Sequence, residues 1–73
     1  MPTLEDRADK YAGDLRTCGG QPYSPRFHRR VAVAWLAGYR GEDRPRLETN
    51  FDKPLWSAWQ DGIDAYDAEE KRP

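Results

Sequence analysis

The chain has 73 residues and a formal net charge of −1, and hydrophobic residues make up 37% of it. That length suits one small domain, and the near-neutral charge argues against a general nucleic-acid-binding protein, whose pI usually exceeds about 9. The single cysteine, Cys18, excludes an internal disulfide and favours a reducing cytoplasm. No apolar run approaches the roughly 20 residues that span a bilayer, so we expect a cytoplasmic protein without membrane contact.

Residues 3–17 are predicted to form an amphipathic helix, for which Thr3 is a suitable N-cap. Apolar side chains recur at helical spacing at Leu4, Ala8, Tyr11 and Leu15. This apolar stripe is thin, and Gly13 costs about 1 kcal/mol relative to alanine inside a helix. We therefore expect the N-terminal amphipathic segment, residues 1–20, to be weakly ordered.

A second helix is predicted from Ser24 to about Arg40. Serine is a favoured N-cap and Pro25 fits the first helical position. One face of this helix carries the expected core residues Phe27, Val31, Ala34, Trp35 and Gly38. The valines leave a strand open as an alternative, but the cap, the length and the alanines favour a helix.

Residues 41–53 are predicted to be a linker, because Pro45 keeps the residue before it out of helical geometry. Leu47 and Phe51 are expected to tuck under the helices, since a fully solvated loop seldom carries both.

A third helix is predicted to begin at Pro54, with Asp52 as its N-cap. Its apolar stripe contains Leu55, Trp59, Gly62, Ile63 and Tyr66. The polar tail, residues 68–73, is expected to fray.

A short motif occurs twice, as AWLAGYRGED at residues 34–43 and as AWQDGIDAYD at residues 58–67. The shared Ala-Trp-x-x-Gly places an indole and a glycine about one helical turn apart on each helix. We therefore expect equivalent core anchors at Trp35 and Trp59, and close helix approach at Gly38 and Gly62. The predicted fold is a mainly α, small single domain (residues 1–73) whose helical core, residues 24–67, is a quasi-repeated helical pair.

Groups for catalysis or metal binding are scarce. His28 is the only histidine and Cys18 the only thiol, so a nucleophile–base pair is not expected. Zinc sites usually need four Cys or His ligands, and no glycine-rich phosphate-binding motif is present. The sequence predicts a protein that is not an enzyme and takes no cofactor or metal.

Groups for binding are abundant. Residues 21–50 carry a net charge of +3 and residues 51–73 carry −3. Arginine forks suit carboxylates and phosphates, and Trp, Tyr and Arg dominate protein–protein hot spots. The predicted partner-binding residues are Tyr23, Arg26, His28, Arg29, Arg30, Tyr39, Arg40, Arg44, Arg46, Trp56, Asp61, Asp64 and Asp67. The alternatives are an ordinary solvated charged surface and, for Trp56, a role in covering the N-terminal helix.

One resemblance lies in the motif that begins at Pro22-Tyr23, continues through Arg30 and ends with WLAGY at residues 35–39. This motif resembles that of the ribosome modulation factors, small bacterial proteins with Pro-Tyr, an arginine and Trp-Leu-x-Gly-Trp. The resemblance implies binding to the ribosome or its RNA.

A second resemblance extends over the whole chain and rests on its size, its arginine-rich middle QPYSPRFHRRVAVAWLAGYR and its acidic end DGIDAYDAEE. In these features the chain resembles the small RNA-polymerase-binding transcription regulator of a Xanthomonas lytic phage. That resemblance implies binding to host RNA polymerase, inhibition of initiation and read-through of terminators, without identifying the subunit.

The expected function is therefore a bacteriophage regulator that binds bacterial RNA polymerase as a monomer in the host cytoplasm, with nucleic acid nearby. The alternative is a ribosome- or rRNA-binding modulation factor. A structural phage protein or a toxin-neutralising protein is a third hypothesis.

Overall fold

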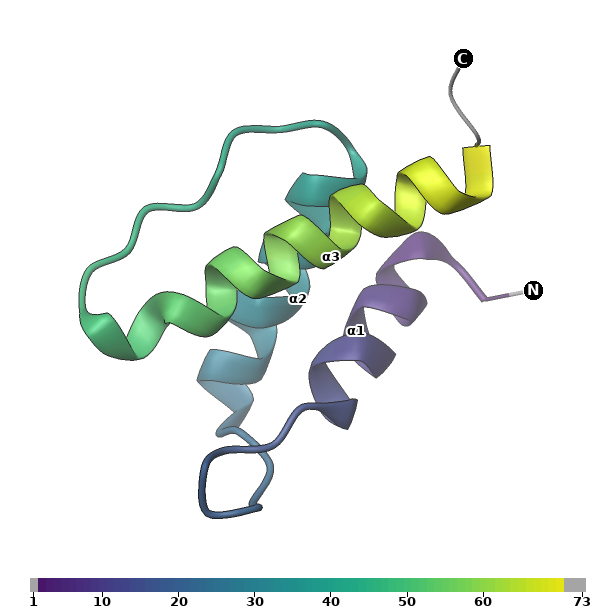
Figure 1. Ribbon diagram of the computed structural model, residues 1–73. Helices are drawn as coiled ribbons and strands as arrows, with labels where there is room; N and C mark the ends of the chain where they lie inside the picture. Colours follow the sequence, from purple (N-terminus) through teal and green to yellow (C-terminus); the bar gives the residue numbers. More distant parts are fainter. Residues whose placement is uncertain (1, 71–73) are drawn as a thin grey trace.

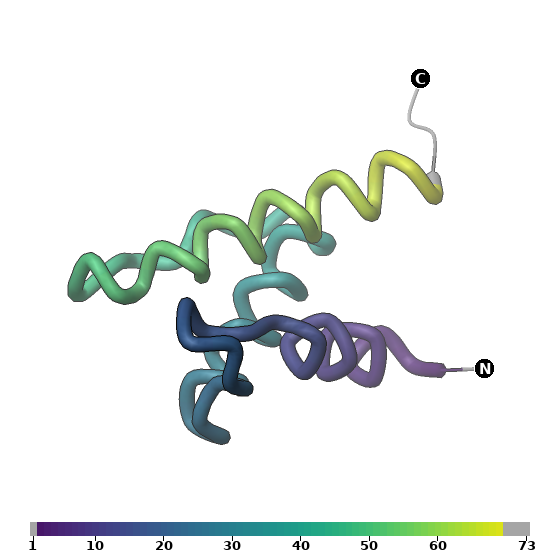
Figure 2. Tube along the Cα trace, turned by 60° about the horizontal axis from the view of Figure 1, so that its bottom comes forward, coloured from purple at the N-terminus to yellow at the C-terminus, as the bar shows by residue number. Residues whose placement is uncertain are grey.

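The computed structural model describes residues 2–70. It contains three α-helices, α1 (Leu4–Asp14), α2 (Pro25–Tyr39) and α3 (Lys53–Glu70), and a 3-10 turn, η1 (Asn50–Asp52), directly before α3. The central helix is α2, which packs against both α1 and α3 (Figures 1 and 2). No strand occurs among the described residues, so the predicted mainly α single domain is confirmed.

The start of α1 follows local sequence rules, whereas its end differs from the prediction. Thr3 and Asp6 form a capping box at the first turn. The helix stops at Asp14, three residues before the predicted end, because Leu15 has extended backbone angles. The chain then turns through a loop in which Arg16 and Pro22 form an isolated β-bridge.

The Ala-Trp-x-x-Gly repeat brings α2 and α3 into backbone contact. A Cβ atom added to Gly38 would lie 1.9 Å from the carbonyl oxygen of Trp59. Reciprocally, a Cβ atom added to Gly62 would lie 2.1 Å from the carbonyl oxygen of Trp35. Each glycine therefore packs on the backbone of the other copy's tryptophan, and the predicted close approach is confirmed.

The two tryptophans of the repeat are not equivalent, which corrects the prediction. Trp35 is 5% exposed, with its ring centroid 6.2 Å from that of Tyr11 in α1. Trp59 is only partly buried, and its Nε1 donates to the Glu42 carbonyl oxygen at 3.0 Å. The asymmetry arises because α1 covers the Trp35 side of the helical pair, whereas the extended linker runs beside Trp59.

The end of the linker reverses the predicted burial of Phe51. Phe51 is 87% exposed, whereas Asp52 is 4% exposed. The Asp52 Oδ2 atom accepts hydrogen bonds from the backbone N of Glu48 at 3.0 Å and of Thr49 at 3.3 Å. These bonds and an ion pair turn the carboxylate inward, and the tight turn then leaves the phenyl ring outside. Leu47 is partly buried against the core, as predicted.

The limits of α3 also differ from the prediction. The helix begins at Lys53 rather than Pro54, and Asp52 bonds back to the linker instead of capping it. The helix continues to Glu70, so the first part of the predicted frayed tail is helical, and residues 71–73 lie outside the described residues. None of the helices within residues 2–70 combines the length and the apolar character needed to cross a membrane.

Candidate protein-binding surface

Two of the six arginines between residues 26 and 46 are ion-paired inside the fold. Arg30 approaches Asp52 with both terminal nitrogens, each 3.2 Å from a carboxylate oxygen. Arg40 Nη2 donates to Glu5 Oε1 of α1 at 2.8 Å. The Arg30 pair is partly buried and holds the end of the linker, whereas the Arg40 pair lies on the surface and contributes little to stability. Both arginines already have a carboxylate partner, which makes them weaker candidates for partner contacts.

A third arginine takes part in fastening the linker to α3. The Trp56 Nε1 donates to the Pro45 carbonyl oxygen at 2.9 Å, as Trp59 Nε1 does to Glu42. Arg44 covers the Trp56 ring, with its guanidinium 4.3 Å from the ring centroid, a contact typically worth about 0.5–1 kcal/mol at an exposed site. Trp56 therefore packs on the linker, and the alternative that it covers α1 is wrong.

The other three arginines are available for a partner. Among residues 2–70, no carboxylate pairs with Arg26, Arg29 or Arg46, and all three are exposed. The helical period places Arg26, Arg29 and Val33 on the face of α2 opposite its buried stripe. Val33 is 59% exposed on this face.

Arg29 and Arg46 stand beside a groove between α2 and the linker. We call it the arginine groove; its volume is about 440 Å³, and it is lined by Arg29, Arg30, Val33, Ala34, Ala37, Asp43, Pro45, Arg46 and Leu55. Most of this lining is aliphatic, and Arg29 and Arg46, which form no ion pair among residues 2–70, line the groove together with Asp43. Val33 was missed in the sequence, although a valine off the buried stripe and one turn from Arg29 was a usable signal.

The histidine and the two tyrosines that were predicted to bind a partner mainly make contacts within the fold. His28 Nε2 lies 2.7 Å from Asp9 Oδ1 in α1, and since a carboxylate only accepts, the imidazole is the donor. Tyr39 stacks on Trp35 at 5.3 Å between ring centroids and donates to Glu69. Tyr23 is partly buried and packs on the Phe27 ring, 4.8 Å away.

The three predicted aspartates are all exposed on α3 and differ in their hydrogen-bond partners. Asp61 accepts a hydrogen bond from the Tyr11 hydroxyl of α1, and burial together with this bond raises the pKa of Tyr11 above its usual range. Asp64 accepts from the Gln60 side chain at 3.1 Å. Of the three aspartates, Asp67 is the one without a side-chain hydrogen-bond partner among residues 2–70.

A second polar contact between α1 and α3, besides that of Tyr11 with Asp61, was not predicted either. Arg7 forms a bidentate ion pair with Glu69, with Nη1 2.8 Å from Oε1, and its guanidinium lies 5.5 Å from the Trp35 ring centroid. The hydrogen bond from Arg7 lowers the pKa of Glu69. The two residues are 62 positions apart, and no local pattern indicates such a pair.

The described residues contain no group of three or more His, Cys, Asp or Glu side chains that could hold a metal ion. The described surface is therefore suited to binding another molecule. It presents arginine side chains beside aliphatic ones, and the indoles of Trp56 and Trp59 hydrogen-bond the linker that carries part of it.

The Asp52 carboxylate makes the stability of this linker depend on pH. Hydrogen bonds from the Glu48 backbone, and then from Arg30, lower the pKa of Asp52. A carboxyl group with a lowered folded-state pKa adds stability above its unfolded-state pKa of about 3.9, and this stability is lost as the pH falls through the folded-state value. We therefore expect Asp52→Asn to be less stable than the parent at pH 7, by a margin that narrows on acidification.

Urea unfolding at a series of pH values, followed by circular dichroism, measures this margin. Asp64→Asn is the control, because Asp64 is exposed and bonds only a neighbouring side chain. A constant difference between Asp52→Asn and the parent down to acid pH would contradict the role of the ionised Asp52.

Comparisons of the chain with protein-family models, with curated proteins and with solved structures found no match.

Proposed function

We propose that this chain is a non-enzymatic phage-type regulator that binds bacterial RNA polymerase through the arginine groove. The supporting observation is the position of Arg29 and Arg46, unpaired among residues 2–70, beside an aliphatic lining. Arginine beside apolar side chains is typical of protein–protein hot spots, where each group supplies part of the binding free energy. The resemblance to a phage regulator supplies the target.

The division of the arginines favours a protein target over RNA. Binding to RNA phosphates depends on the number of free cations, and two of the six central arginines are ion-paired within the fold. The aliphatic lining adds little to a phosphate contact, but it can bury an apolar side chain of a protein beside a carboxylate. Ribosome binding is thus the second candidate, supported by the motif that begins at Pro22-Tyr23.

On this proposal the protein acts as a monomer in the host cytoplasm by occupying a polymerase surface near nucleic acid. Occupation of that surface reduces initiation at host promoters and permits read-through of terminators. In vitro transcription with purified host polymerase measures both effects on one template.

We expect Arg29→Glu and Arg46→Glu each to weaken polymerase binding about tenfold, or about 1.4 kcal/mol. The physical reason is that each change removes a fork and places a carboxylate against the carboxylates of the partner. Biolayer interferometry with immobilised polymerase measures the dissociation constants. Thermal melts of both variants should match the parent, because neither arginine is ion-paired among residues 2–70.

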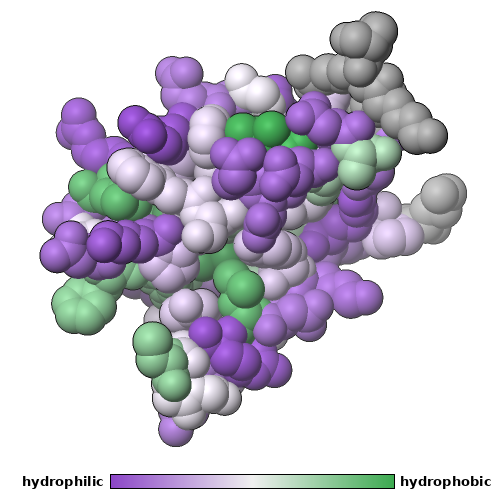
Figure 3. Space-filling model, viewed as in Figure 1, coloured by the Kyte–Doolittle hydropathy of each residue, from purple (hydrophilic) through white to green (hydrophobic). Residues whose placement is uncertain are grey.

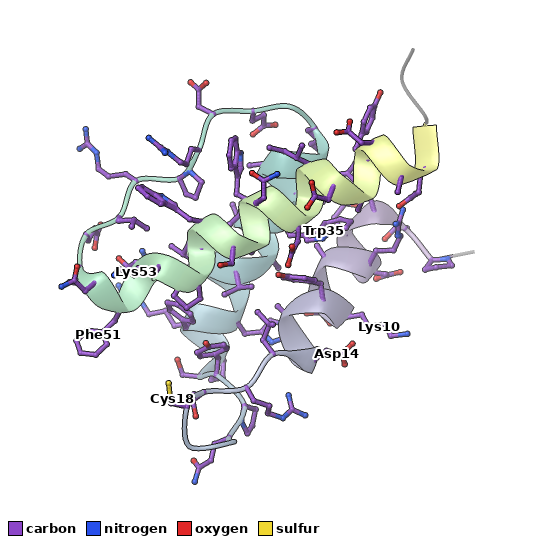
Figure 4. All side chains as sticks on the ribbon, in the orientation of Figure 1. Lys10, Asp14, Cys18, Trp35, Phe51 and Lys53 are labelled. Carbon is purple, nitrogen blue, oxygen red and sulfur yellow. The ribbon has the colours of Figure 1, made fainter. Side chains whose placement is uncertain are left out.

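Lys10→Glu is the matched control, since it makes the same change in charge at an exposed position of α1 that does not line the arginine groove (Figure 4). Its polymerase affinity should stay within about twofold of the parent. Binding to purified ribosomes, together with no binding to polymerase, would overturn the proposal in favour of the ribosome modulator. Equal losses in all three variants would instead indicate a non-specific charge effect.

A further inference from the structure

A second groove lies at the other end of α2, between the loop after α1 and the start of α3. Its volume is about 570 Å³, and its lining includes Cys18, Tyr23, Phe27, Phe51 and Pro54, which we call the aromatic groove. In Figure 3, apolar side chains project at the lower left over these two segments, where Figure 4 places Phe51 and Cys18. The aromatic groove shares no lining residue with the arginine groove.

The exposed Phe51 ring is presented by a fixed turn and not by a loose loop. Thr49 Oγ1 accepts a hydrogen bond from the Phe51 backbone N at 3.2 Å. The next residue, Asp52, is buried and is held by Arg30 and by two backbone N–H groups. Both neighbours of Phe51 are thereby anchored by secondary structure or hydrogen bonds, while the ring itself is 87% exposed.

The opposite wall of the groove is also aromatic. The rings of Tyr23 and Phe27 pack at 4.8 Å between centroids, and Arg30 lies over Phe27 at 5.8 Å. An apolar side chain placed between this wall and Phe51 would be covered by rings on two sides. Accessible aromatic side chains around a hollow are the kind of surface on which an apolar side chain of a partner can be anchored.

The charged side chains near the aromatic groove indicate which kind of partner it favours. Arg26 lines an adjoining depression that shares Ser24 and Phe27 with the groove, and Lys53 precedes the lining residue Pro54. Neither cation pairs with a carboxylate among residues 2–70. Asp52 is neutralised by Arg30, and the adjoining depression is lined by one carboxylate, Glu48, which forms no ion pair within residues 2–70. The cations therefore outnumber the free carboxylates beside the groove.

We propose that the aromatic groove binds an acidic amphipathic segment of a partner protein. One apolar side chain of the segment inserts between Phe51 and the Tyr23–Phe27 wall, and its neighbouring carboxylates pair with Arg26 and Lys53. The proposal goes beyond the regulatory function above, because it requires neither polymerase nor the arginine groove.

The same observations disfavour two other occupants. A symmetric dimer built on this groove would bring Arg26 and Lys53 of both copies, unpaired within residues 2–70, into one interface, and each copy would add one further carboxylate, Glu48, from the adjoining depression. A single-stranded nucleic acid requires a track of cations along its backbone besides stacking rings, and no cation is among the described residues that line this groove. An acidic peptide satisfies both the rings and the cations.

The test uses the full chain and a short fluorescent peptide of glutamates and leucines with one central tryptophan. Fluorescence anisotropy gives the dissociation constant, and amide shifts in NMR spectra locate the peptide. We expect shifts at residues 17–27 and 50–54. Phe51→Ala should weaken binding about tenfold or more without affecting folding, because the ring is exposed. Phe51→Trp, which retains a large ring, should restore most of the affinity.

Controls separate this site from the arginine groove and from other occupants. Val33→Ala shortens the exposed apolar side chain of the arginine groove. This change and Arg29→Glu should both leave the affinity for the peptide unchanged. A peptide with lysine for glutamate should not bind. Unchanged affinity in Phe51→Ala, displacement of the peptide by oligo-dT, or a dimer in sedimentation that Phe51→Ala dissolves would each overturn the proposal.

Discussion

Gly38→Ala is expected to abolish cooperative folding. The new Cβ atom would lie 1.9 Å from the carbonyl oxygen of Trp59 and 2.8 Å from its carbonyl carbon. These atoms belong to the backbone of α3, so no rotamer change can relieve the clash, and the two helices must separate. Overpacking costs typically about 1–3 kcal/mol and occasionally more. A Cβ atom placed this deep in the backbone of a packed helix should cost more than that typical range. Because the net stability of a domain is only about 0.05–0.15 kcal/mol per residue, we expect the loss to remove most or all of it.

Gly62→Ala should behave in the same way, because its Cβ atom would lie 2.1 Å from the carbonyl oxygen of Trp35. Gly13→Ala is the matched control within a helix. Its Cβ atom would lie 3.5 Å from His28 Cε1, an ordinary contact, so we expect a gain of about 0.5 kcal/mol from reduced backbone entropy of the unfolded chain. Thermal melts followed by circular dichroism measure all three variants. A cooperative melt of Gly38→Ala near the parent midpoint would disprove direct backbone packing.

The glycines show how much of this fold could be predicted from the sequence. A glycine at the same position of two similar helical segments predicted close helix approach, because glycine is otherwise costly inside a helix. The start of α2 was equally accessible, since Ser24 Oγ accepts from the Phe27 backbone N at 3.4 Å and Pro25 follows the cap. Both features depend on residues close together in the chain.

Burial in the linker could not be predicted in the same way. Hydropathy favours Phe51 inside and Asp52 outside, but the structure has the reverse. The reason is the position of Arg30, 22 residues away, which supplies the charge that makes a buried carboxylate tolerable. The outcome depends on a tertiary pair, and no local pattern around residues 50–52 announces it.

The sequence indicated what kind of residues a binding surface would contain, but not which of the arginines would be free to bind a partner. The sequence identified an arginine-rich region, yet it could not divide the arginines into paired and unpaired groups. Arg40 is neutralised by Glu5 of α1, and Arg44 lies over Trp56, whereas Arg29 and Arg46 remain unpaired among residues 2–70. This division requires the arrangement of α1, the linker and α3 around α2.

Trp35→Ala is expected to cost about 3–5 kcal/mol, the usual range for a buried tryptophan. Its ring contacts the rings of Tyr11 in α1 and of Tyr39 in α2, and the Arg7 guanidinium lies 5.5 Å from its centroid. Removal of the indole therefore opens a cavity and takes away the surface on which α1 packs. The loss is comparable to the whole stability of a domain of this size, so the variant should be unfolded at room temperature.

Trp59→Ala should cost much less, about 1–2 kcal/mol, from one net hydrogen bond and the burial of part of one ring. Its Nε1 holds only the Glu42 carbonyl of the linker, and the ring is partly exposed, so solvent can fill the space that it leaves. Trp59→Phe separates these contributions, since it keeps a ring and loses the donor. Urea unfolding gives the free energy of each variant. If Trp35→Ala and Trp59→Ala lowered the free energy of unfolding equally, the two tryptophans would be equivalent core anchors after all. That result would contradict the conclusion that α1 buries Trp35 but not Trp59.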